Sequence, residues 1–401
     1  MYLETPRKFR ALVSQAHQVA ANYLRPLSRK YDRAEHAYPK ELDLLAALLD
    51  GMNAGSPDAV GAGVAGARGQ GESEGVRNGG NLSACLAVME MCWGDVGLLL
   101  SMPRQGLGNA AIAAVANEEQ RRRFAHVWAA MAITEPGCGS DSAAIRTTAV
   151  RDGEHYVLNG EKIFVTAGAR ADAVVVWATL DRNLGRAAIK SFVVEKGTPG
   201  MTVTRLEKKL GIKASDTASI SFQECRVPAA NLLGSPEIDP QKGFAGVMET
   251  FDNTRPLVAA MAVGLARAAL DRSRELLERA GCRFERNRPL LALKHAEARW
   301  HRYEAEWEAA RLLTLKAAWM ADNRQPNSRE ASIAKAKAGR MVGEVTLGCV
   351  ELVGALGYGE DELLEKWARD AKILDIFEGT QQIQQLIIAR RLLGKGSGEL
   401  R

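Results

Sequence analysis

The chain of 401 residues lacks the cysteine and histidine patterns that mark metal sites and disulfide scaffolds. None of its six cysteines is spaced as Cys-x-x-Cys, and none of its six histidines forms His-Glu-x-x-His or another ligand pair. Cys85 and Cys92 lie seven residues apart in an apolar helical run, a spacing more typical of core packing than of metal binding. The sequence therefore predicts no metal site and favours a reduced, cytoplasmic setting.

Long apolar runs and strongly basic segments are also missing. No stretch of 18 apolar residues occurs and the start of the chain has no signal-peptide pattern, so we expect no membrane span. Lys and Arg number 53 against 48 Asp and Glu, a net charge of +5, and the positive tracts at residues 121–123 and 390–391 are short. Such tracts are usually solvated helix faces, so nucleic acid is not predicted as a partner.

The N-terminal third is predicted to be helical around one long irregular segment. Apolar residues recur every three or four positions over residues 7–24, which predicts a helix ended by Pro26, and a second helix should run from Pro39 to Gly51. Residues 51–80 are rich in Gly, Ala, Ser and Asn, which predicts a loop. Further helices are expected at residues 82–93, 106–116 and 118–124, giving an N-terminal helical domain over residues 1–125.

After Phe124 the period of the apolar residues changes from 3.6 to 2. Asp152-Gly153 and Asn159-Gly160 are hairpin signals. Short strands without helices between them predict an antiparallel barrel or sandwich, not a doubly wound dinucleotide-binding sheet. We expect this β domain over residues 126–236, with strands at residues 127–134, 145–151, 154–158, 173–179, 188–195, 202–206 and 219–223.

Helical patterns dominate the remainder of the chain. Long runs with apolar periodicity cover residues 244–280, 290–320 and 328–356. Helices of this length pack against one another as a bundle, which we expect over residues 237–401. The predicted fold class is therefore α+β, with an N-terminal helical domain, a central β domain and a C-terminal helical bundle.

The most informative carboxylate is Glu378. It follows an apolar approach containing Ile376 and Phe377 and precedes Gly379 and Thr380, where a new amphipathic helix begins. Desolvation by apolar neighbours raises the pKa of a carboxylate and makes it a usable proton acceptor near neutral pH. The first turn of the following helix offers free N–H groups to a carbonyl or an anion. The alternative is an acid in the first turn of a helix, where acids are favoured anyway.

Two segments of the β region carry groups suited to a planar ring. Residues 132–141, AITEPGCGSD, run from a strand into a Gly-Cys-Gly turn, where Thr134 offers a donor and Ser140 can hydrogen-bond a second ligand. In residues 160–168, GEKIFVTAG, Phe164 and Thr166 sit two apart and face the same side of a strand. An aromatic wall beside a hydroxyl suits a flavin. The alternatives are an ordinary Pro-Gly loop and an ordinary strand.

These segments resemble, in order and spacing, the acyl-CoA dehydrogenase family. AITEPGCGSD resembles its flavin signature, KIFVT its flavin wall, KLGIKASDT with RVP the exit of its β domain, and RDAKILDIFEGTQQIQ the signature that bears the base. A further segment, FDNTRP, opens a helix that could present Asp252 and Arg255 to an anionic ligand. This helix looks most like the medium-chain and short-chain branches of the family.

The resemblance implies an FAD-dependent dehydrogenation of a fatty acyl-CoA to the trans-2-enoyl-CoA. Glu378 would take the α-proton while FAD accepts the β-hydride. Some members place the base directly before the arginine that matches Arg255, but Thr254 stands there in this chain, which supports Glu378 as the sole base. Substrate contacts are implied for Ser140, Asp252, Thr254, Arg255 and Gly379, and cofactor contacts for Met131, Ile133, Thr134, Ser140, Phe164, Val165, Thr166, Arg279, Gly354, Gly379, Thr380 and Gln382.

Three segments depart from the family pattern. The usual Arg-x-x-Phe-Gly segment, which reaches the FAD of a neighbouring subunit, reads ERAGCRFERNRP here, with Arg279 in the place of the arginine. The usual Gln-x-x-Gly-Gly loop begins with Glu351 and keeps Gly354, and an acid near the ADP part of FAD is unfavourable unless it points elsewhere. Residues 51–80 replace a loop at the substrate mouth, so the preferred acyl length cannot be read.

The resemblance leaves several alternatives open. A homotetramer or dimer with an electron-transferring flavoprotein as acceptor is the main expectation, and an acyl-CoA oxidase using oxygen is an alternative. The departures also allow a mixed oligomer, in which a paralogous subunit completes the cofactor site. A non-catalytic flavoprotein of the same fold is disfavoured because Glu378 is present.

Overall fold

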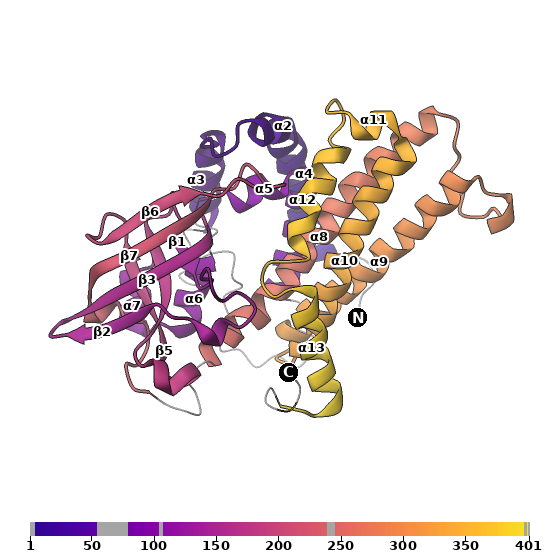
Figure 1. Ribbon diagram of the computed structural model, residues 1–401. Helices are drawn as coiled ribbons and strands as arrows, with labels where there is room; N and C mark the ends of the chain where they lie inside the picture. Colours follow the sequence, from indigo (N-terminus) through magenta and orange to yellow (C-terminus); the bar gives the residue numbers. More distant parts are fainter. Residues whose placement is uncertain (1–4, 54–78, 104–106, 239–244, 397–398, 400–401) are drawn as a thin grey trace.

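The computed structural model describes residues 5–53, 79–103, 107–238, 245–396 and 399, and places a curled sheet beside a bundle of long helices. Figure 1 shows the sheet on one side of the molecule and the long C-terminal helices on the other. The helices within residues 25–53 lie at one end of the junction between them, and those within residues 107–123 lie beside the sheet. The predicted loop at residues 51–80 falls mostly outside the described residues. No helix among the described residues is both long enough and apolar enough to span a bilayer.

The N-terminal helix does not end at Pro26, contrary to the prediction. It passes through a π-helical turn at Ala20–Leu24 and continues as α2, Arg25–Arg33, with Pro26 in its first turn. Proline is tolerated there because the π-helical turn interrupts the regular hydrogen-bond ladder just before it, with the N–H of Arg25 donating to the Ala20 carbonyl. Similarly, α3 continues past Gly51. The remaining N-terminal helices are α1 Arg10–Val19, α3 Glu41–Asn53, α4 Gly80–Gly94, α5 Val96–Leu100, α6 Leu107–Val115 and α7 Glu118–Arg123.

The sheet has seven strands and is mixed, so the prediction of a purely antiparallel barrel or sandwich is wrong. Its order is β1-β4-β2-β3-β7-β6, with β5 also paired to β4. β1 and β4 pair in parallel, which is possible because the β2–β3 hairpin lies in the long connection between them. The strands are β1 Ala129–Ala132, β2 Thr148–Asp152, β3 His155–Thr166, β4 Ala173–Thr179, β5 Ile189–Glu195, β6 Met201–Leu206 and β7 Thr217–Pro228.

Of the two predicted hairpin turns, only Asp152-Gly153 is confirmed. Asp152 pairs with His155 across the turn, and Gly153 has a φ of +58°. Asn159-Gly160 lies inside β3, where the register with β7 shifts. A Cβ at Gly160 would lie 2.5 Å from the Thr147 hydroxyl oxygen, so glycine is required there by close packing. An Asn-Gly pair within a strand marks a bulge as readily as it marks a turn.

The C-terminal helices pack around small apolar side chains. Alanines of α8 and α10, such as Ala262, Ala266 and Ala338, are fully buried in the largest core cluster, which lets the helix backbones approach closely. Gly264 also lies against the backbone of α4. The helices are α8 Ala245–Arg279, α9 His295–Asp322, α10 Ser328–Val353, α11 Ala355–Tyr358, α12 Leu364–Leu374 and α13 Gln381–Leu393.

A buried charge cluster joins the three parts of the molecule at α12. The ammonium group of Lys366, fully buried, contacts the carboxylate of Asp95, the N-cap of α5, and lies 2.6 Å from Asp370 Oδ2 on its own helix. Asp370 Oδ1 accepts a hydrogen bond of 2.5 Å from the backbone N–H of Ile212, in the connection between β6 and β7. A single helix therefore anchors both the sheet and the N-terminal helices.

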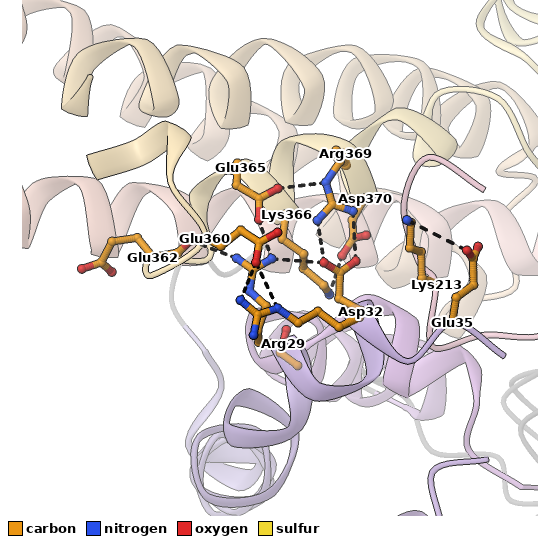
Figure 2. Close-up of polar contacts among 12 residues, drawn as sticks. Arg29, Asp32, Glu35, Lys213, Glu360, Glu362, Glu365, Lys366, Arg369 and Asp370 are labelled. Carbon is orange, nitrogen blue, oxygen red and sulfur yellow. Dashed lines mark hydrogen bonds and ion pairs between the residues drawn. The ribbon is translucent and has the colours of Figure 1, made fainter. Parts of the chain in front are cut away.

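A second, more accessible layer of ion pairs surrounds this cluster (Figure 2). Arg369 on α12 binds both carboxylate oxygens of Asp32 on α2, at 2.9 and 2.6 Å. Glu365 pairs with Arg369 at 2.9 Å and with Arg29 at 2.5 Å. A bidentate pair within a network holds its geometry better than an isolated surface pair. These contacts fix the start of the segment that leads to Glu378.

Candidate active site

Glu378 lies in the connection between α12 and α13, outside both helices. The backbone of Glu378 has a φ of +52°, and Gly379 follows with a φ of +94°. The next helix begins at Gln381, with Thr380 as its N-cap. The alternative that Glu378 is an ordinary acid of a first helical turn does not apply to this geometry. A left-handed conformation at a residue with a side chain is uncommon and persists only where neighbouring contacts hold it.

Two buried side chains hold the backbone of this connection. Gln384 on α13 donates from Nε2 to the carbonyls of Glu378 and Gly379 at 3.3 and 3.2 Å. Lys335 on α10 donates from Nζ to the Gly379 carbonyl at 2.6 Å. A Cβ at Gly379 would lie only 2.4 Å from Gln384 Nε2, so both the space and the positive φ require glycine.

The Glu378 carboxylate is desolvated and only partly satisfied. Its pKa is raised by burial, although a hydrogen bond with Thr254 and the charges of Lys335 and Arg255 act in the opposite direction. Oε2 is shielded from solvent and has no hydrogen-bond partner among the described residues. Buried carboxylate oxygens are normally paired, so an unsatisfied one with a raised pKa is a candidate proton acceptor.

At neutral pH the Glu378→Gln variant should unfold at a higher temperature than the wild type. The folded pKa of Glu378 is raised, so the ionised carboxylate destabilises the native state above that pKa, and a neutral amide does not. The advantage of the variant should vanish as the pH falls below the ordinary glutamate pKa of about 4.3, because Glu378 is then protonated in both the folded and the unfolded chain. Thermal unfolding across acid and neutral pH measures this, and a less stable variant at neutral pH would contradict it.

The helix α8 brings two of the predicted substrate residues beside Glu378. Thr254 and Arg255 are both buried, and both act on the Glu378 carboxylate. The side chain of Asp252 lies outside the described residues. Lys335 and Gln384 are not among the residues predicted from the sequence. Helical spacing could have indicated that Lys335 is buried. It lies four residues after the buried Ala331 and three before the buried Ala338, on the face that periodicity assigns to the core.

The predicted flavin-binding residues of the sheet come together at the ends of β1 and β3. The backbone N–H of Ile163 donates to the Thr134 carbonyl at 2.9 Å, which joins the two segments directly. Phe164 is 58% exposed and has a φ of +57°. Its neighbour Val165 is fully buried, and Thr166, Met131 and Ile133 are half-buried. An exposed aromatic ring held in an uncommon backbone conformation beside hydroxyl and backbone groups fits the flat face of a flavin.

A buried ion pair, also not predicted, shapes the turn after β1. Lys162 on β3 is fully buried and lies 2.7 Å from Glu135 Oε1. Glu135 also accepts hydrogen bonds from the N–H groups of Arg146 and Thr147, at 2.6 and 2.9 Å. These contacts lower the pKa of Glu135 against the effect of its burial. The turn thus leaves Ser140 exposed.

The other predicted cofactor residues lie away from this group. Arg279 at the end of α8 and Gly354 at the end of α10 are exposed, and Figure 1 shows both helix ends at the far end of the bundle from the sheet. Glu351 does not stand as a free charge, because it pairs with Arg299 at 2.9 Å. Gln382 is exposed on α13. Within the described ranges, no three His, Cys, Asp or Glu side chains converge as metal ligands.

Comparison with known proteins gives consistent results along most of the chain. Residues 6–131, 130–225 and 241–393 match the family models described as the N-terminal, middle and C-terminal domains of acyl-CoA dehydrogenase. A probable acyl-CoA dehydrogenase, YngJ of Bacillus subtilis, is 36% identical over 80% of this chain and 85% of its own. Acryloyl-CoA reductase (NADH) of Anaerotignum propionicum is 33% identical over 96% and 95%. The structure of butyryl-CoA dehydrogenase from Megasphaera elsdenii superposes with a TM-score of 0.83 at 31% identity, covering 98% of this chain and 100% of that one.

Proposed function

This chain belongs to the acyl-CoA dehydrogenase family, an FAD-dependent oxidoreductase acting on acyl-CoA, and we propose that it forms the trans-2-enoyl-CoA with Glu378 as the base. The observation that carries this proposal is the unsatisfied, buried Oε2 of Glu378 on a backbone held by Lys335 and Gln384. The substrate α-proton transfers to this oxygen. The raised pKa of Glu378 makes the transfer feasible near neutral pH.

The backbone around Glu378 also supplies a donor for the thioester. An α-proton becomes acidic enough for a carboxylate when hydrogen bonds hold the neighbouring carbonyl oxygen. Within the described residues no backbone carbonyl accepts the N–H of Glu378, so this group is available to the thioester oxygen. Thr254 and Arg255 are buried beside the carboxylate and shield one side of it from water.

The residues at the ends of β1 and β3 fit the flavin of FAD. Thr134 and Thr166 would be its polar partners and Phe164 its wall, and Ser140, Gly379, Thr380 and Gln382 would complete the cofactor and substrate contacts. When bound, FAD accepts the β-hydride of the substrate. Arg279 and Gly354 lie at helix ends on the far side of the bundle from this group (Figure 1), and they would act on the FAD of a neighbouring subunit in a homotetramer or dimer.

Short-chain acyl-CoA thioesters are the proposed substrates, and an electron-transferring flavoprotein is the proposed acceptor, in fatty acid β-oxidation. The likeness to butyryl-CoA dehydrogenase supports the short chain length. A mixed oligomer with a paralogue is the second candidate. The departures from the family pattern at Arg279 and Glu351 favour it, whereas the pairing of Glu351 with Arg299, which neutralises the acid, favours a self-sufficient oligomer.

Anaerobic addition of butyryl-CoA to the purified chain should bleach the flavin absorbance, and longer acyl chains should bleach it more slowly. The bleaching measures proton and hydride removal together, and the series of acyl lengths ranks the substrates. A chain that purifies yellow supports a self-sufficient oligomer, whereas a colourless chain that gains flavin only with a paralogue supports the mixed one. A flavin-loaded protein that no acyl-CoA bleaches would contradict the proposed function.

A further inference from the structure

Lys335 is a lysine buried in the middle of a long helix, at the point where α10 crosses the base-bearing connection. It is fully buried, and its ammonium group donates to the Gly379 carbonyl at 2.6 Å. One turn later, a Cβ at Gly339 would lie 2.9 Å from the Leu374 carbonyl oxygen. Glycine at 339 therefore lets α10 approach the end of α12 closely enough for Lys335 to reach Gly379.

The charges around Lys335 come from three other elements. Asp375 at the end of α12 and Glu378 favour its charged form, whereas Arg255 on α8 opposes it. Desolvation dominates and lowers the pKa of Lys335 to about 8. Two cations, Lys335 and Arg255, and two carboxylates, Asp375 and Glu378, thus lie together around the base. Removal of one cation leaves an excess of buried negative charge.

We propose that Lys335 is a positioning residue for the base: it holds the Gly379 carbonyl, fixing the left-handed backbone that aims Glu378, and its buried ammonium group favours the ionised form of the Glu378 carboxylate. The first role follows from the contact of Lys335 with the Gly379 carbonyl, which belongs to the residue next to Glu378. The second follows from the charge of Lys335, which acts on the Glu378 carboxylate. The inference rests on the proposed function, because it concerns the residue assigned as base.

The roles of the two charges also change together during turnover. When Glu378 takes a proton it becomes neutral, and Lys335 then loses one of the two carboxylates that favour its charged form. The charged form of Lys335 in turn favours the ionised form of Glu378. Lys335 therefore favours the return of Glu378 to its ionised form, ready for the next substrate.

The first test is the pH dependence of kcat/KM with butyryl-CoA for the wild type, Lys335→Met and Lys337→Met. Lys337 lies on the same helix, is more accessible and pairs with Glu306, so it controls for loss of a lysine from α10. An opposite charge nearby lowers a carboxyl pKa by about 1–3 units. Without the charge of Lys335, the acid side of the pH profile of kcat/KM should therefore move to higher pH by about one unit or more. The acid side of the Lys337→Met profile should coincide with that of the wild type. An acid side that does not move in Lys335→Met would overturn the proposal.

The second test needs no activity and separates this inference from the proposed function. Unfolding equilibria at neutral pH are measured for the wild type, Lys335→Met, Glu378→Gln and the double variant. Lys335→Met should lower the folded-to-unfolded ratio at least about fivefold more in the wild type than in Glu378→Gln, where no carboxylate is left unbalanced. If the effects of Lys335→Met on this ratio in the two backgrounds agree within about twofold, the proposal is overturned even if the protein dehydrogenates acyl-CoA.

If Lys335→Met does not fold, Lys335→Gln replaces it in both tests, because it keeps an amide donor while removing the charge. A non-additive unfolding cycle in a protein that no acyl-CoA reduces would support the pairing of Lys335 with Glu378 and contradict only the assigned reaction.

Discussion

Glu378→Gln should lower the rate of acyl-CoA-dependent flavin reduction by about 10³- to 10⁴-fold, the upper range for loss of a positioned general base. The amide has nearly the same shape as the carboxylate and keeps an oxygen for Thr254, but it cannot accept the α-proton. Because the backbone of the connection is held by Lys335 and Gln384, flavin content should be unchanged. Stopped-flow absorbance with butyryl-CoA, and exchange of the α-proton with deuterated solvent, measure the two consequences separately.

Glu360→Gln is the matched control, since Glu360 is exposed and pairs with Arg33 away from the connection.

A rescue variant provides a further test of Glu378 as the base. Thr254 hydrogen-bonds the Glu378 carboxylate, so a carboxylate at position 254 would lie beside the same reacting atoms. Thr254→Glu combined with Glu378→Gln should recover part of the lost rate. Proton exchange that persists in Glu378→Gln at the wild-type rate would show that another group is the base.

Lys366→Met should destabilise the fold by about 3–5 kcal/mol, the usual effect of breaking a buried ion pair from one side. Lys366 is the only ammonium group that the described structure places against both Asp95 and Asp370, and all three side chains are buried. Methionine fills similar space but leaves two carboxylates without their cation. Chemical denaturation at neutral pH, monitored by tryptophan fluorescence and circular dichroism, measures the loss.

The pH dependence of this loss is a second check. Burial raises the pKa of Asp370, so this group takes up a proton more readily than a free aspartate as the pH falls. The deficit of Lys366→Met should therefore shrink in acid, and Asp370→Asn added to Lys366→Met should recover part of it. Lys372→Met, an exposed change on the same helix, should cost little. Equal stability of the Lys366 and Lys372 variants would contradict the role of the cluster.

Local patterns predicted much of the secondary structure because they record which face of each element is buried. β4 has the predicted bounds, residues 173–179, and the ends of α4, α6, α7 and α8 lie within two residues of their predicted positions. Where two local signals compete, the prediction was wrong. Pro26 suggests a helix end but sits in a first turn, and Asn159-Gly160 suggests a turn but forms a bulge. At Gly160 a contact with another segment decides, since a Cβ there would meet Thr147, and at Pro26 the π-helical turn directly before it decides.

By itself the sequence determined the three-part organisation, the family and the position of Glu378, because each follows from periodicity or from residue order within a short segment. Only the tertiary structure decided the parallel pairing of β1 with β4, the left-handed backbone at Glu378, and the gathering of Lys335, Gln384 and Thr254 around it. The physical reason is that a desolvated charge depends on neighbours from other helices. No local pattern specifies that α10 and α8 meet the carboxylate, or that Lys335 holds its backbone.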